Sequence, residues 1–80
     1  MTPEQIAARL TQAQKRALKW ARADWDRPVT KTHASHCRGL FLDRLLDRAK
    51  DLEDGHYVTV YRLTPLGLAV RTIVEQEQQP

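Results

Sequence analysis

Residues 57–70, with the sequence YVTVYRLTPLGLAV, decide the fold of this 80-residue chain. The first half of the segment is rich in β-branched and aromatic residues, which favour a strand. In the second half, Thr64 is followed by Pro65, a pair typical of a helix N-cap with proline at the first helical position. The segment therefore predicts a strand that runs directly into a helix.

A hairpin turn is predicted just before this strand. Asp54 and Gly55 form a dipeptide that strongly favours a two-residue turn, because both central residues of such a turn need positive φ. The segments upstream space their apolar residues by three and four, as helices do. The chain is therefore expected to consist of helices, then one hairpin, then a closing helix.

The segment from Tyr61 to Pro65, together with Gly67, has the pattern Tyr-Arg-Leu-Thr-Pro-x-Gly. This pattern resembles the wing and the following helix of winged helix-turn-helix proteins, and small MarR-like and PadR-like bacterial regulators carry similar segments. The resemblance implies a mainly α fold with a small β-hairpin (α+β), the winged helix-turn-helix. It also implies a DNA-binding transcriptional regulator, although the motif is more typical of a fold than of one function.

Two capping-box patterns lie in the N-terminal quarter of the chain. Thr2 is followed by Gln5, and Thr11 by Gln14. They favour a break or bend near Leu10, and one continuous helix is the alternative. The resemblance implies that the first helix of the domain opens at the second pattern. The chain is then expected to divide into an N-terminal helical arm, a winged helix-turn-helix domain and a flexible tail, at residues 1–10, 11–76 and 77–80.

The connection to the next helix is polar. Pro28 disfavours helical geometry in the residue before it, so the preceding helix is expected to end around residues 24–26, with Trp25 over the end of the core. Residues 28–36 follow as a polar connection, in which Val29 is expected to make a short bridge to the wing.

A recognition helix is expected at residues 40–50. Between Ser35 and Leu52 the apolar residues again keep helical spacing. Gly39 interrupts this run. Either it forms the turn of the helix-turn-helix, or a single helix runs through it at a cost of about 1 kcal/mol. In both cases residues 40–50 occupy the place of the recognition helix.

The positive charge of the chain points to duplex DNA as a partner. The formal net charge is +3, and the lysines and arginines concentrate in residues 1–22 and 31–50. DNA binding needs cations along the phosphates, and arginine is suited to paired hydrogen bonds with guanine. Arg44 and Arg48 are expected to share one helix face. The candidate DNA-binding residues are Lys31, Thr32, Ser35, Arg38, Arg44, Arg48, Lys50 and Arg62.

The acidic residues favour an alternative. Asp43, Asp47 and Asp51 repeat along the expected recognition helix and are compatible with a solvated face held by local ion pairs. Asp51, Glu53 and Asp54 make the region of the turn acidic, whereas DNA-contacting wings of the family usually carry basic tips. The alternative is a protein-binding winged helix, an accessory or inhibitor domain of phage or mobile-element type that docks on another protein.

The size of the chain favours self-association. A single core is marginal at 80 residues, so a homodimer is expected. The closing helix carries an apolar stripe, part of which is a candidate dimer contact. The stripe consists of Leu66, Ala69, Val70, Ile73 and Val74.

Other functions are not expected. His33 and Cys37 are one helical turn apart and His56 would add a third ligand, but no paired metal-binding motif is present, so neither a metal nor a cofactor is predicted. The sequence has no nucleophile motif and no phosphate-cradling glycine loop, so an enzyme is not expected. The single cysteine and the lack of a signal peptide or long apolar run favour a cytoplasmic protein without a membrane partner.

Overall fold

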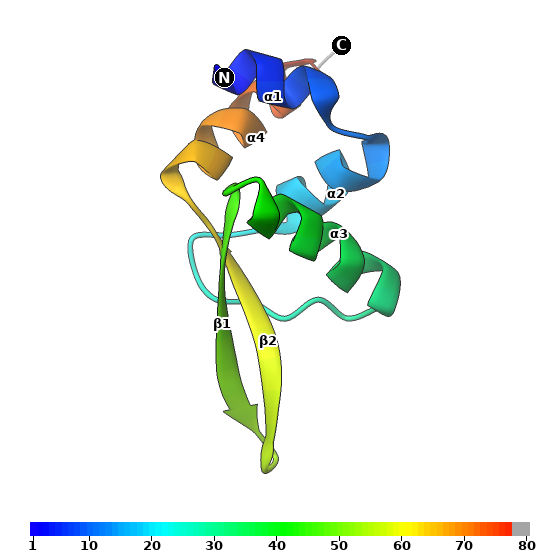
Figure 1. Cartoon of the computed structure of the whole chain (residues 1–80), viewed down its shortest axis with the longest axis vertical. Coiled ribbons are helices and arrows are strands. Elements are labelled where there is room, and N and C mark those ends of the chain that lie inside the picture. Colours follow the sequence, from blue (N-terminus) through cyan, green and yellow to red (C-terminus); the bar gives the residue numbers. More distant parts are fainter. Residues whose placement is uncertain (78–80) are drawn as a thin grey trace.

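The chain folds into four helices and one antiparallel hairpin (Figure 1). This computed structural model describes residues 1–77, so most of the tail expected at 77–80 lies outside the described residues. The α+β layout is compatible with a winged-helix-like arrangement. In chain order the elements are α1 (Pro3–Arg9), α2 (Gln12–Trp20), α3 (Lys31–Leu42), β1 (Leu46–Glu53), β2 (His56–Leu63) and α4 (Pro65–Glu77).

The break expected near Leu10 is confirmed. Thr2 and Thr11 each accept a hydrogen bond from the backbone three residues on, and each glutamine at that position accepts one from the cap in return. Two short helices therefore form in place of one. The first does not stand apart as an arm, since α1 packs against α4 of the same chain.

The hairpin forms at the expected turn. Asp54 and Gly55 have φ values of 51° and 80°, and the strands pair from Glu53 with His56 to Leu46 with Leu63. The strands extend away from the helices as an arm, which gives the molecule a longest dimension of 43 Å (Figure 1).

The cap expected at the start of α4 is also confirmed. The Gly67 backbone amide donates to the Thr64 hydroxyl oxygen at 2.9 Å, and Pro65 is the first residue of the helix. Gly67 is required here because the first turn of α4 lies directly against the carbonyl of Leu45, so that a Cβ at this position would collide with it.

The prediction of a recognition helix at residues 40–50 is wrong, because residues 46–53 form β1. The helix before the hairpin is α3, which begins after its N-cap Thr30 and runs through Gly39, so this glycine is not the turn of a helix-turn-helix. It ends because Arg44 adopts φ 64°, and the backbone amide of Leu45 donates to the carbonyl of Leu40 at 2.9 Å, a Schellman ending. Arg44 and Arg48 therefore do not share a helix face.

Three details of the connection from α2 to α3 also differ from expectation. α2 ends at Trp20, before the expected boundary at residues 24–26. The bridge to β2 is made by Asp26, which exchanges backbone hydrogen bonds with Tyr61, whereas Val29 is 90% exposed. Trp25 does not cover the core. It is 42% exposed and lies against the guanidinium of Arg62.

The core lies where the helices meet the root of the hairpin. Leu18, Leu40, Leu45 and Leu46 are fully or almost fully buried there. Most of the apolar stripe on α4 belongs to the same core, since Val70 and Val74 are fully buried and Leu66 and Ile73 pack against it. This stripe is thus largely covered within the chain. Ala69 is its one exposed residue, and the dimer contact expected on part of the stripe stays a prediction. Among the described residues no helix has the length and apolarity needed to cross a membrane.

Candidate nucleic-acid interface

Helix α3 exposes one continuous polar stripe. Lys31, Ser35 and Arg38 are spaced four and three residues apart, so they lie on one face, and all three are exposed. The exposed Leu42 continues the stripe at the helix end. No residue of α3 is acidic. The helix thus presents a line of cations and a hydroxyl without a competing carboxylate.

The hairpin separates its charges by face. Successive residues of a strand point to opposite sides, and directly paired residues point to the same side. We call the side that includes Arg48 and its partner Tyr61 the groove face, and the opposite side the outer face. The groove face consists of Leu46, Arg48, Lys50, Leu52, Tyr57, Thr59, Tyr61 and Leu63. The outer face consists of Asp47, Ala49, Asp51, Glu53, His56, Val58, Val60 and Arg62.

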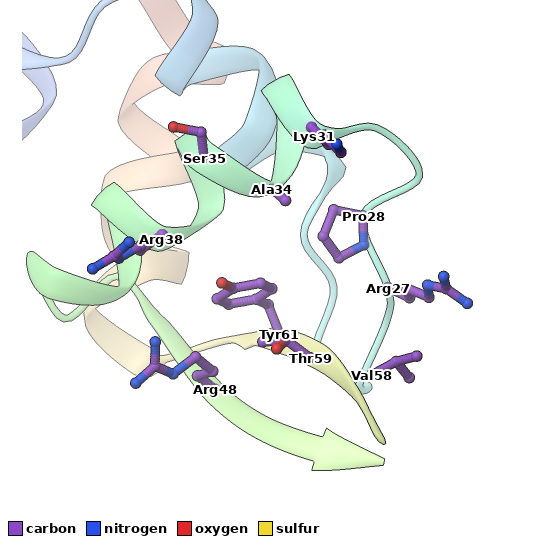
Figure 2. A pocket seen from close by; sticks show the side chains of 10 residues that line it. All are labelled: Arg27, Pro28, Lys31, Ala34, Ser35, Arg38, Arg48, Val58, Thr59 and Tyr61. Atoms are coloured by element: carbon purple, nitrogen blue, oxygen red, sulfur yellow. The ribbon is translucent and has the colours of Figure 1, made fainter. Parts of the chain in front are cut away.

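A pocket of about 580 Å³ lies between α3, the hairpin and the segment at residues 27–28 (Figure 2). We call it the basic groove. Four side chains in its wall are cationic, and none is acidic. The lining residues are Arg27, Pro28, Lys31, Ala34, Ser35, Arg38, Arg48, Val58, Thr59 and Tyr61, of which only Val58 belongs to the outer face of the hairpin. The potential inside the basic groove is therefore positive, which suits a polyanion.

Four of the eight predicted site residues come together in this groove, although they are far apart in sequence. Lys31, Ser35 and Arg38 come from α3, and Arg48 comes from β1. Lys50 lies on the same hairpin face, one pleat nearer the tip, opposite Thr59. The predicted surface is thus partly assembled, but from a helix and a strand and not from one helix.

The other three predicted residues lie elsewhere. Thr32 lines a separate pocket with Arg16 and His36, on the α2 side of α3. Arg44 lies in the turn after α3, near Asp47 and Leu42. Arg62 is on the outer face. The structure does not bring these side chains into the basic groove.

Two ion pairs reduce the charge of the outer face. Arg62 Nε lies 3.4 Å from the Asp47 carboxylate, and Arg27 donates to Glu53 at 3.1 Å. All four side chains are about half exposed, so each pair contributes little to stability. Arg27 therefore reaches the edge of the basic groove with its charge already shared.

Tyr61 forms the floor of the groove. It is 4% exposed, and its hydroxyl points into the space beside Arg38 and Arg48 (Figure 2). Burial raises the pKa of this hydroxyl and Cys37 adds to the rise, while the charges of Arg48 and Arg38 act in the opposite direction. At neutral pH the phenol therefore keeps its proton and can donate a hydrogen bond.

Arg48 is held in place by an aromatic ring. Its guanidinium carbon lies 4.2 Å from the centroid of the Phe41 ring, an arrangement that favours a cation over the ring face. Phe41 belongs to the last turn of α3. The contact therefore fixes the arginine of the hairpin relative to the helix across the groove.

Sequence reasoning did not find Tyr61 and Arg27 as site residues. The sequence marks Tyr61 only as part of a strand, and Arg27 only as the residue before Pro28. The alternation of strand residues would have identified Tyr61. A two-residue turn at 54–55 followed by a strand that ends at Leu63 implies a preceding strand that begins at Leu46. In that register Tyr61 is directly opposite Arg48.

The histidines and the cysteine do not assemble a site. Cys37 is fully buried, and burial raises the pKa of its thiol to about 11. His33 packs edge-on against Trp20 with ring centroids 4.5 Å apart, and burial lowers its pKa. Within residues 1–77 no group of three or more His, Cys, Asp or Glu side chains is placed to hold a metal ion.

No protein-family model, no curated protein and no solved structure matches this chain. Its function is therefore inferred from the basic groove and the elements around it.

Proposed function

We propose that this chain is a small DNA-binding regulator that binds double-stranded DNA with α3 and the groove face of the hairpin. The exposed stripe of α3 lies along the major groove, where Lys31, Ser35 and Arg38 are placed to contact the phosphates at its edge. The hairpin follows the DNA backbone with Arg48 and Lys50. The segment bound in the major groove is thus α3, in place of residues 40–50.

The shape of the molecule supports this arrangement. The DNA major groove is about 12 Å wide and admits one α-helix. α3 is followed at once by the hairpin, so a helix and an extended arm flank one concave surface (Figure 1). A DNA strand that borders the major groove then lies between α3 and the hairpin, where its phosphates contact the cations of the basic groove.

The observation that carries the proposal is the separation of charge across the hairpin. The groove face has Arg48 and Lys50 and no carboxylate, whereas Asp47, Asp51 and Glu53 are all on the outer face. Of these acidic residues only Glu53 acts on the groove, through its ion pair with Arg27 at the groove edge. A face that served only solubility would not need to sort its charges in this way.

Fluorescence anisotropy of a labelled random duplex of about 25 base pairs tests the proposal, at about 50 and about 200 mM salt. The wild-type chain is expected to bind in the micromolar range and to weaken steeply with salt. Arg38→Glu and Arg62→Glu form a matched pair, since both change the net charge equally but only the first lies in the groove. We expect Arg38→Glu to lower the affinity for the duplex by more than about tenfold, and Arg62→Glu to change it by less than about threefold.

Equal losses for the two variants would show that the chain attracts DNA only through its net charge. Absence of duplex binding at the lower salt concentration would refute the proposal. Thermal unfolding of both variants controls for stability, because each substitution removes an exposed side chain and is expected to cost less than about 1 kcal/mol.

A protein-docking function is the second candidate, and the tip of the hairpin favours it. Leu52 and Tyr57 are directly paired there, and they are 61% and 74% exposed. An apolar pair at the end of an extended arm is suited to a shallow apolar site on another protein. Tyr57→Ser with Leu52→Ser separates the candidates, because DNA binding through the basic groove does not require this pair.

A further inference from the structure

Three polar groups meet at one end of the basic groove. Figure 2 shows the guanidinium groups of Arg38 and Arg48 and the hydroxyl of Tyr61 on the same side of the pocket, with Arg27 and Lys31 on the other side of the Tyr61 ring. The three groups come from α3, β1 and β2 respectively. The arrangement exists only in the folded chain, because it joins residues of three different elements at one end of an open groove.

The two arginines are available to an external anion. Within residues 1–77 the ion pairs occupy Arg27, Arg62, Arg71 and Lys15, and neither Arg38 nor Arg48 is among them. Arg48 is oriented by the Phe41 ring, which holds the guanidinium without neutralising it. Two arginines without an ion-pair partner among residues 1–77 thus line the same groove, where both can contact one anion.

The third group is a neutral donor. Tyr61 is anchored in the core by its ring and by the backbone hydrogen bonds with Asp26, at 2.8 and 2.9 Å. Its phenol is protonated at neutral pH, because burial keeps its pKa above the usual value. A tyrosine whose ring is buried while its hydroxyl faces a cationic space is placed to donate to an oxygen of the anion.

We propose that Arg38, Arg48 and Tyr61 form a seat for a single phosphate group of the nucleic acid backbone. The inference rests on the DNA-binding function proposed above and specifies one contact within it. A guanidinium group can donate two parallel hydrogen bonds to a phosphate, and a phosphodiester offers two non-bridging oxygens that share one negative charge to the two arginines and the phenol. The seat therefore fixes the register of the backbone relative to α3.

The seat is tested first with inorganic phosphate as the probe. A titration followed by NMR of backbone amides and arginine side chains is expected to shift signals of Arg38, Arg48 and Tyr61 in a saturable way. Potassium chloride at equal ionic strength serves as the control and is expected to leave these signals in place. Tyr61→Phe keeps the ring but removes the donor, and should weaken phosphate binding by about tenfold.

The second test uses the duplex. Neutral methylphosphonate is placed at each backbone position in turn of the tightest-binding duplex selected from a random pool. One position per bound protein is expected to lose about tenfold in affinity for the wild-type chain, and this loss should shrink in Arg48→Gln and Tyr61→Phe. Arg62→Gln is the matched control on the outer face of the same hairpin and should retain the full positional effect.

The outcomes separate this proposal from the function on which it rests. Duplex binding with no sensitive backbone position, or with the same position sensitive in Tyr61→Phe and Arg48→Gln, overturns the seat and leaves DNA binding intact. Saturable phosphate binding without any duplex binding retains the seat and overturns the DNA function, in which case the phosphate belongs to another ligand. Shifts that do not saturate and also appear with chloride refute the seat.

Discussion

The two faces of the hairpin are built from the same two strands and differ in what they offer a partner. The groove face carries Arg48 and Lys50 beside aromatic rings, and the outer face carries three carboxylates with Arg62. Along the sequence these charges are intermixed and sum to zero. The strand sorts them by sign because its side chains alternate with a period of two. A charge summed along a segment therefore says little about the surface that the segment presents.

Exchanging Asp47 and Arg48, which lie on opposite faces of the hairpin, is expected to have the largest effect on duplex affinity. The double variant Asp47→Arg with Arg48→Asp keeps the composition and the net charge, but it brings a carboxylate to the groove face beside Arg38. We expect duplex affinity to fall by about 100-fold, measured by anisotropy at low salt.

A stability control accompanies that exchange, because Asp47→Arg places a second cation directly opposite Arg62. Like charges directly across a strand pair cost up to about 1 kcal/mol, which thermal unfolding will show. Unchanged affinity in a folded variant would mean that the sign of each face does not matter for binding.

Exchanging Lys50 and Asp51 makes the same reversal nearer the tip. Both side chains are exposed and neither lies in the core, so folding should be unaffected. Because Lys50 lies beyond the lining of the basic groove, the expected loss in duplex affinity is smaller, about tenfold. A loss as large as that of the first exchange would place the DNA nearer the tip than proposed.

Glu53→Gln is expected to raise duplex affinity, whereas the two exchanges lower it. Glu53 shares the charge of Arg27 at 3.1 Å, and its loss leaves this arginine free at the edge of the groove. We expect duplex affinity to rise by about threefold and the free energy of unfolding to fall by less than about 1 kcal/mol, since the pair is half exposed. Anisotropy and chemical denaturation measure the two effects. An Arg27→Gln background should abolish the gain in affinity.

Gly55→Ala is expected to change stability without changing affinity. Gly55 has φ 80°, where a side chain is strained, so the substitution should cost about 1 kcal/mol of stability. The register of the strands is set by the pairs along their whole length as well as by the turn, so both faces keep their residues. A fall in duplex affinity below the melting temperature would show that the turn itself takes part in binding.

The sequence was sufficient wherever the signal is local. The capping boxes at Thr2 and Thr11, the Asp54-Gly55 turn and the Thr64-Pro65 cap each depend on a few neighbouring residues, and all form as expected. The boundary between α3 and β1 does not depend on neighbours alone. Leu45, Leu46, Ala49 and Leu52 also fit helical spacing, and only pairing with β2 makes them part of a turn and a strand.

The candidate site shows the same division. Lys31, Ser35, Arg38 and Arg48 could be selected from residue type, because cations and hydroxyls suit phosphates whatever element carries them. Their arrangement in space could not be predicted, since it depends on where α3 ends and the hairpin begins. Tyr61 was missed because its role follows from its position opposite Arg48, and that position exists only once the register is known.

The root of the hairpin is joined to both neighbouring helices. The Thr64 hydroxyl donates to the carbonyl oxygen of Arg44 at 2.8 Å and accepts from Gly67, while the Leu45 amide bonds to Leu40 at the end of α3. The first turn of α4 at Gly67 lies directly against the Leu45 carbonyl, so this junction joins the arm to both helices. If DNA is the partner, as proposed, the duplex has to adapt its shape to this junction. We therefore expect flexible pyrimidine–purine steps to be preferred at positions that no side chain touches.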